Sequence, residues 1–140
     1  MTAKEYLEQY KTLDVQIDAK IAQAQRLRER AQYVSSTSSG DIHGSQPSDK
    51  VGELTAKIVD LEREINAEID RLIDLKREIK ELIAKLPDAR QKSVLELHYI
   101  NRRSFLKIAG QMHYSVETIY LIHRVALKNF AVYYSKYVLY

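Results

Sequence analysis

Apolar residues recur every three or four positions near the start of the chain, from about residue 3 to residue 34. This spacing is that of a heptad seam along one side of a helix, and the single polar position within it is Lys20. No proline or glycine falls inside this stretch, so the pattern predicts one long amphipathic helix. The seam consists of Tyr6, Tyr10, Leu13, Ile17, Ala24, Leu27, Ala31 and Val34.

A second seam with the same stepping follows, in a helix expected to start at Ser48 or Asp49 and to end at Leu86. Glu68 fills its one polar position, and a helix of this length would span roughly 50 Å. The intervening residues 35–48 are rich in serine and glycine, which predicts a polar loop. The second seam consists of Val51, Leu54, Ile58, Leu61, Ile65, Leu72, Leu75, Ile79, Leu82 and Leu86.

The two seams would cover one another if the chain folded back on itself as an antiparallel coiled-coil hairpin. In that register Lys20 comes within about one turn of Glu68, which predicts an ion pair that fixes the register. Two unrelated solvated charges are the alternative, since both side chains are long enough to reach water. Ile69, Ile73 and Ile83 widen the second stripe and leave apolar surface for a homodimer.

A domain boundary is expected at Pro87, because proline disfavours helix at the residue before it. The predicted domains are therefore the hairpin, residues 1–86, and a small module, residues 87–140. Asp88 would cap a helix over 89–100 that buries Val94, Leu97 and either Tyr99 or Ile100. The tyrosines that end the chain are expected to pack against the hairpin or a partner.

The stretch from Phe105 to Arg124 has the pattern of a helix-turn-helix. Ser104 would cap its first helix, His113 and Tyr114 would form the turn, and Ser115 would cap a second helix that continues to Tyr133 or beyond. A simple amphipathic hairpin is the alternative. The expected inward residues are Ile108, Ala109, Met112, Tyr114, Ile119 and Ile122.

Composition supports an all-α fold, since the chain has only four glycines and two prolines among its 140 residues. It has no cysteine, no run that resembles a membrane span and no signal-peptide core, so a cytoplasmic protein is expected. Charge is uneven: residues 1–87 hold 14 lysines and arginines against 16 acidic residues, whereas residues 88–140 hold 8 against 3. A basic terminal module favours a polyanionic partner, although solvation would also account for the excess.

A helix-turn-helix that reads double-stranded DNA places its second helix in the major groove. Arg124 would then reach a guanine edge or a phosphate, Leu121 or Val116 a thymine methyl, and Glu117 a cytosine amine. Tyr120 shares this outward face. Phosphate contacts are expected from Arg102, Arg103, Ser104, Lys107, Ser115 and Lys128.

No enzyme chemistry is expected, because the sequence offers no catalytic triad, paired-carboxylate pocket or nucleotide-binding loop. His113 and His123 lie ten residues apart across a turn and form no ligand set, so no metal or other cofactor is expected. His43 lies in the predicted loop, and no residue is spaced along the sequence so as to form a ligand set with it.

Two parts of the chain resemble known proteins. Leu86–Arg90, Val94–Tyr99 and Ser104–Leu127 look like region four of bacterial sigma factors, the module that reads the −35 promoter element. Asp49–Lys50 and Ile58–Asp70 are similar to a family of small proteins from phages and prophages of Gram-positive bacteria. That family joins a coiled-coil hairpin to a helix-turn-helix and is related to late-gene activators of the ArpU and RinA type.

This resemblance implies an all-helical regulator in a bacterial host cell that binds promoter DNA, with RNA polymerase as a second contact or the hairpin as a dimerisation element. The chain departs from the family at Glu117, Tyr120 and Leu121, where sigma-like recognition helices usually carry basic residues. One alternative is a module that docks on a host protein without touching DNA. Another is a small terminase subunit, although such proteins place the DNA-binding module before the coiled coil.

Overall fold

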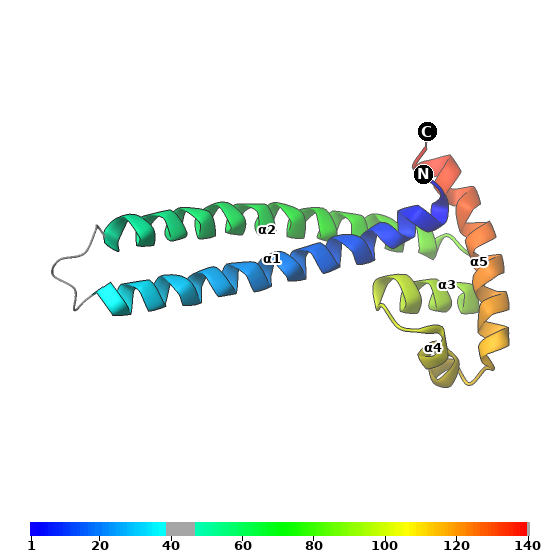
Figure 1. Cartoon of the computed structure of the whole chain (residues 1–140). Helices are drawn as coiled ribbons and strands as arrows, with labels where there is room; N and C mark the ends of the chain where they lie inside the picture. The colour runs from blue at the N-terminus through cyan, green and yellow to red at the C-terminus, as the bar shows by residue number, and fades with distance from the viewer. Residues whose placement is uncertain (39–46, 140) are drawn as a thin grey trace. The chain divides into compact units, whose positions relative to one another are not determined.

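The computed structural model describes residues 1–38 and 47–139, and all the regular secondary structure in these ranges is helical, as the all-α prediction requires (Figure 1). The elements are α1 (Ala3–Ser38), α2 (Pro47–Ala84), α3 (Ala89–Leu95), the π-helical turn η1 (Glu96–Ile100), α4 (Phe105–Met112) and α5 (Val116–Tyr137).

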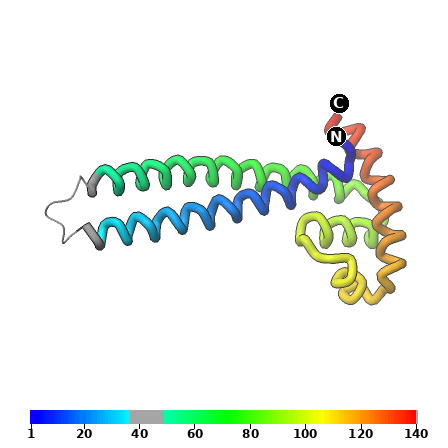
Figure 2. The backbone as a smooth tube through the Cα atoms, in the orientation of Figure 1, coloured from blue at the N-terminus to red at the C-terminus, as the bar shows by residue number. Residues whose placement is uncertain are grey.

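The chain divides into two compact units, which can be followed by residue number in Figure 2. The hairpin unit is Asp14–Arg71, and the head unit is Met1–Leu13 together with Leu72–Tyr140. This division differs from the predicted boundary at residue 86, because the first residues of α1 and the end of α2 share a core with the terminal helices.

Within the hairpin unit the two long helices pack against one another in antiparallel directions. Ala24 from α1 is buried with Leu61 and Ile65 from α2, and Leu27 and Ile69 pack against this cluster. The Lys20 ammonium group donates a hydrogen bond to Glu68 and lies 3.5 Å from Glu64. The predicted pairing of the two polar seam residues is therefore confirmed.

The predicted bounds of the polar loop were wrong on both sides. α1 continues to Ser38, with the Ser36 hydroxyl donating to the Gln32 carbonyl at 2.9 Å, and α2 already begins at Pro47. Proline suits the first helical position because its missing N–H would have no helical partner there. The remaining loop residues, 39–46, including His43, lie outside the described residues.

The predicted end of α2 was also late by two residues, since the helix ends at Ala84. After Ala84 the backbone forms a tighter turn, in which hydrogen bonds join residues three positions apart. Lys85 N–H donates to the Leu82 carbonyl at 3.1 Å, and Leu86 N–H donates to the Ile83 carbonyl at 3.0 Å. Leu86 is nonetheless fully buried, so the end of the apolar seam runs past the end of the helix.

The head unit contains two apolar cores. The large core joins the start of α1 and the end of α2 to α3, η1 and the second half of α5. Its buried residues are Ala3, Tyr6, Leu7, Tyr10, Ile79, Leu82, Ile83, Leu86, Leu95, Tyr99, Ile100, Ala126, Phe130 and Tyr134. The small core joins α3, α4 and the first half of α5 through Val94, Ile108, Ala109 and Ile119. The single helix α5 therefore contributes to both cores.

Val94 and Leu95 are neighbours in sequence, yet they enter different cores. The predicted helix over 89–100 is here a short α-helix followed by a π-helical turn, in which Asn101 N–H donates to the Glu96 carbonyl at 3.0 Å. The wider turn changes the angular spacing of the side chains, so both Tyr99 and Ile100 are buried where one was expected.

The terminal tyrosines pack within the head unit. The Tyr134 and Tyr6 rings lie 4.9 Å apart between centroids, and the Tyr134 hydroxyl donates to the Met1 carbonyl at 3.4 Å. Tyr137 stacks on Tyr133 and lies beneath the Lys85 ammonium group, 4.3 Å from the ring centroid. The expectation that the terminal tyrosines pack against the hairpin or a partner is confirmed for Tyr134, which contacts Tyr6 of α1, whereas Tyr140 lies outside the described residues.

Candidate nucleic-acid interface

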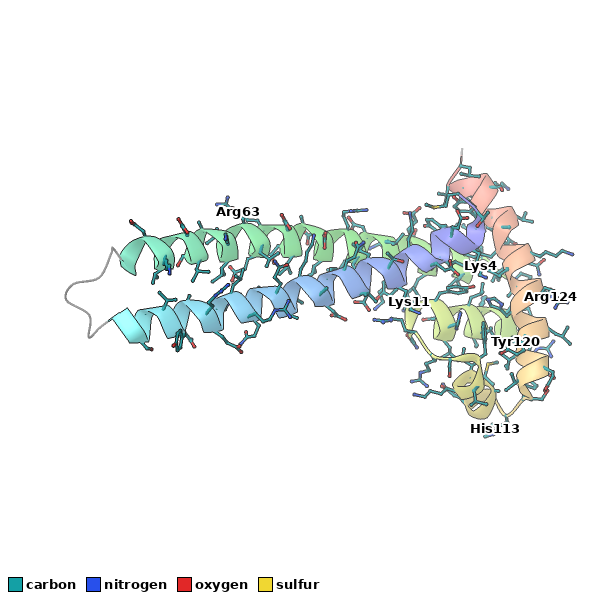
Figure 3. The ribbon with its side chains drawn as sticks, viewed as in Figure 1. Lys4, Lys11, Arg63, His113, Tyr120 and Arg124 are labelled. Carbon is teal, nitrogen blue, oxygen red and sulfur yellow. The ribbon has the colours of Figure 1, made fainter. Side chains whose placement is uncertain are left out.

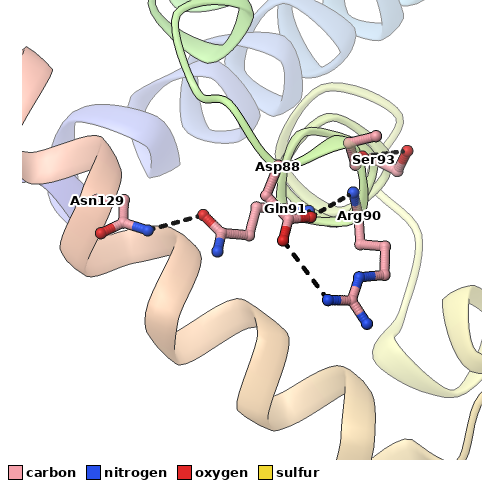
Figure 4. Close-up of polar contacts among 6 residues, drawn as sticks. Asp88, Arg90, Gln91, Ser93 and Asn129 are labelled. Carbon is pink, nitrogen blue, oxygen red and sulfur yellow. Dashed lines mark hydrogen bonds and ion pairs between the residues drawn. The ribbon is translucent and has the colours of Figure 1, made fainter.

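The helix that precedes the motif, α3, is fixed at its amino end by Asp88 (Figure 4). The Asp88 carboxylate accepts from Arg90 N–H at 2.8 Å and from Gln91 N–H at 3.3 Å, as predicted for a cap. These backbone bonds, to Gln91 first, lower the pKa of the carboxyl group. The Gln91 side-chain carbonyl accepts from the Asn129 amide at 2.9 Å, which ties α3 to α5.

Both predicted serine caps of the motif are confirmed. The Ser104 hydroxyl accepts from Lys107 N–H at 3.2 Å at the start of α4, and the Ser115 hydroxyl accepts from Thr118 N–H at 3.2 Å at the start of α5. Between them His113 has φ 62°, and Tyr114 N–H donates to the Ala109 carbonyl at 3.0 Å. A left-handed residue closing α4 in this way gives the tight turn that the pattern predicted.

Two of the predicted side-chain directions were wrong. Tyr114 is 38% exposed rather than inward, because the left-handed turn carries it away from the small core. Val116 was expected to face outward, but it is half-buried and packs against the small core with Met112 and Ile122. Val116 is therefore poorly placed to contact a thymine methyl.

The other residues expected on the outward face of α5 are exposed. Glu117 and Arg124 are exposed, Tyr120 is 49% exposed and Leu121 is 57% exposed. Tyr120 and Arg124 are labelled in Figure 3. Lys128, one turn beyond Arg124, is exposed as well. The first half of α5 thus presents polar, charged and apolar side chains to solvent.

Four of the predicted phosphate-binding residues lie at the connection between η1 and α4 or in the first turn of α4. Arg102, Arg103, Ser104 and Lys107 are all exposed. Arg102 has φ 57°, and the Arg103 guanidinium group donates to the Gln111 side-chain carbonyl.

A ring contact joins this basic connection to the outward face of α5. Phe105 follows Ser104 directly, and its ring lies 5.1 Å from the Tyr120 ring between centroids. The structure therefore brings the start of α4 against the face of α5 that carries Tyr120 and Leu121. Phe105, which was not a predicted site residue, thus links the basic connection to the predicted site residue Tyr120.

A cluster of four rings beneath this surface was not foreseen from the sequence. His98 stacks on Phe105 with centroids 4.0 Å apart, Phe105 lies 4.8 Å from His123, and the Tyr99 hydroxyl lies 2.7 Å from His123 Nε2. Burial, then the neighbouring charges of His98 and Lys4, lowers the pKa of His123 to about 4. These rings come from η1, α4 and α5, so no sequence spacing connects them.

Metal and membrane sites are not evident in the described parts of the chain. Among residues 1–38 and 47–139, no group of three or more histidine, aspartate or glutamate side chains is placed to hold a metal ion. No helix within these same ranges is long and apolar enough to cross a membrane.

Comparison with protein families gives one match. Residues 33–131 match the family described as "Protein of unknown function (DUF1492)", and this region is well over half of the 140-residue chain. The chain belongs to this family. The DUF1492 match covers α2, α3, η1, α4 and most of α5, and therefore includes the whole helix-turn-helix. No curated protein and no solved structure matches the chain.

Proposed function

We propose that this DUF1492 protein is a DNA-binding transcription regulator of phage type, acting in the cytoplasm of a bacterial host. The observation that carries the proposal is the first half of α5, which is capped by Ser115, exposed on its outer face and joined to a basic connection through Phe105 and Tyr120. A helix amino end flanked by cations suits a groove lined by phosphates.

Each exposed group has a role in this proposal. Arg124 contacts a guanine edge or a phosphate, Leu121 packs on a thymine methyl and Glu117 accepts from a cytosine amine. Arg102, Arg103, Lys107 and Lys128 bind phosphates and supply most of the affinity. The protein is not an enzyme and uses no cofactor.

The hairpin unit serves dimerisation or a contact with RNA polymerase in this proposal. Apolar side chains that remain exposed on its helices support such a role: Ile21 is 46% exposed and Val59 is 40% exposed. Dimers of a helix-turn-helix protein bind two half-sites about one helical turn of DNA apart, or multiples of that distance.

The test is fluorescence anisotropy with duplex DNA fragments selected by the protein from sheared prophage-containing genomic DNA, repeated across a salt series. We expect affinity to fall steeply with salt, because phosphate contacts release bound cations. The Arg102→Ala/Arg103→Ala variant should weaken binding to every fragment and reduce the logarithmic salt slope by about 2.

The matched control is Arg63→Ala/Arg71→Ala, which removes the same charge from exposed positions of the hairpin unit. We expect this control to keep the wild-type salt slope. Equal losses of DNA affinity in the two double variants would show that only the net charge of the protein matters, and would count against a specific interface.

A module that docks on a host protein is the second candidate. It is favoured by exposed apolar side chains on α4 and α5, of which Leu106 is 71% exposed and Val125 is 46% exposed. No salt-dependent DNA binding by the folded wild-type protein would reject the regulator and leave this candidate.

A further inference from the structure

The connection between η1 and α4 is held by three hydrogen bonds to the π-helical turn. Asn101 N–H donates to the Glu96 carbonyl at 3.0 Å, and Arg103 N–H donates to the Leu97 carbonyl at 3.0 Å. On its other side, the Arg103 carbonyl lies 2.8 Å from His98 Nδ1. Both backbone polar groups of Arg103 are thus bound to η1.

The geometry of this connection needs such support. Arg102 lies between two of the bonded residues and has φ 57°, a left-handed conformation that residues other than glycine disfavour. A disfavoured backbone conformation persists only when surrounding contacts determine it. The bonds at Asn101 and Arg103 flank Arg102 and supply those contacts.

His98 makes two kinds of contact at once. Because a carbonyl can only accept, the bond to Arg103 requires that His98 carry a proton on Nδ1. Its ring also stacks on Phe105, with centroids 4.0 Å apart, and Phe105 in turn contacts Tyr120 on the outward face of α5. One side chain therefore reaches both the basic connection and the base of the exposed face.

We propose that His98 is a positioning residue for nucleic-acid binding, which holds Arg103 and its neighbour Arg102 in the orientation that meets the phosphate backbone. This inference rests on the proposed DNA-binding function. His98 itself is half-buried beneath the surface and does not contact the DNA. It acts through the Arg103 carbonyl.

Two substitutions separate the two contacts of His98. His98→Phe keeps an aromatic ring against Phe105 and removes the Nδ1 donor, whereas His98→Asn places an amide N–H near the position of Nδ1 and removes the ring. We expect His98→Phe to weaken duplex binding about three- to tenfold, the range of one hydrogen bond, and to reduce the logarithmic salt slope by about 1. His98→Asn should keep the wild-type slope.

The decisive comparison uses the Arg102→Ala/Arg103→Ala background. If His98 acts by orienting these two arginines, then His98→Phe should change the affinity of the Arg102→Ala/Arg103→Ala protein by less than twofold. A merely structural role would lower the thermal midpoint and would weaken binding by the same factor in both backgrounds. If His98→Phe does not fold, His98→Gln replaces it in the comparison with His98→Asn, because the glutamine amide lies one bond further from the backbone than the asparagine amide.

The outcomes are distinguishable. Wild-type affinity and slope in His98→Phe, or equal effects in both backgrounds, would overturn the positioning role while leaving DNA binding intact. Absence of salt-dependent binding by the wild-type protein would overturn the proposed function and this inference together.

Discussion

The Tyr99 hydroxyl lies 2.7 Å from Nε2 of His123, and both groups lie within the head unit between η1 and α5. Tyr99 is buried, and burial followed by the charge of Glu8 raises the pKa of its phenol, so the hydroxyl stays protonated and donates. His123 Nε2 must then accept, which requires the imidazole to be neutral. Protonation of His123 would remove this acceptor.

This pair predicts a loss of stability at mildly acidic pH. The folded-state pKa of His123 is about 4, below its ordinary value of 6.5, so the unfolded chain binds the proton more readily between these values. The stability that the neutral His123 contributes to the folded state is fully present above pH 6.5 and is lost as the pH falls toward 4. Because His123 is partly exposed, we expect a change of about 1–2 kcal/mol rather than the full value implied by the shift.

Urea unfolding at several pH values between 4 and 7.5 measures this change. The control is Tyr99→Phe/His123→Leu, which removes the titrating imidazole and its donor together, so that carboxylates titrating near pH 4 contribute equally to both proteins. The pH dependence of the control should be shallower between 6.5 and 4. Identical pH profiles would contradict the neutral, half-buried state of His123.

A second prediction tests the large core with two positions on α5. Phe130 is fully buried and stacks toward Tyr6 with centroids 6.4 Å apart, whereas Val132 is 64% exposed. We expect Phe130→Ala to lower the free energy of unfolding by about 3–5 kcal/mol because it leaves a cavity. Val132→Ala should change it by less than about 0.5 kcal/mol. Comparable losses in chemical denaturation would disprove the assignment of the buried face.

A third prediction separates capping from phosphate binding at Ser115. Ser115→Asn keeps a capping side chain and Ser115→Asp keeps it with a negative charge, whereas Ser115→Ala removes the cap and should cost about 1 kcal/mol of stability. If the start of α5 approaches phosphates, Ser115→Asp should retain stability but lose DNA affinity, because like charges repel. Thermal unfolding and anisotropy on the same samples measure both. Equal affinities of Ser115→Asn and Ser115→Asp would place the phosphates elsewhere.

A fourth prediction concerns Lys20 and Glu68 in the hairpin unit. The Glu68 side chain is only 18% exposed, so Lys20→Met leaves a half-buried carboxylate without its closest cation and should lower the midpoint of thermal unfolding. Lys20→Met/Glu68→Leu should restore or raise the midpoint, since apolar seam residues pack without a desolvation penalty. A double variant less stable than Lys20→Met would mean that Glu68 has a further role. Circular dichroism melting distinguishes these results.

Local chemistry explains which parts of the fold could be predicted from the sequence. The caps at Asp88, Ser104 and Ser115 depend on residues two or three positions away, and each was confirmed. The pairing of Lys20 with Glu68 followed from the periodicity of the two seams. Such features are determined by spacing along one or two helices.

The features that were missed depend on contacts between distant elements. Leu7 and Leu95 are fully buried, but neither lies on the seam or inward pattern predicted for its helix, because each faces a core built from several elements. The contact between Tyr99 and His123 likewise joins η1 to α5, and nothing in the sequence pattern indicated the π-helical turn. The outward face of α5 was largely predicted, except at Val116, where packing against the small core outweighed the expected outward direction.

The helix α5 contributes to both cores and is rigid, because Val116–Tyr137 contains no proline or glycine at which it would readily bend. A tilt imposed at its first turn is therefore transmitted to the far end, where Phe130 and Tyr134 touch the Tyr6 ring. The protein has ten tyrosines and no tryptophan, and Tyr6 and Tyr134 are among the tyrosines at this far end. Binding of DNA at the first turn of α5, as proposed above, should therefore alter tyrosine fluorescence even in a Tyr114→Phe/Tyr120→Phe variant, in which no tyrosine remains at that end of the helix.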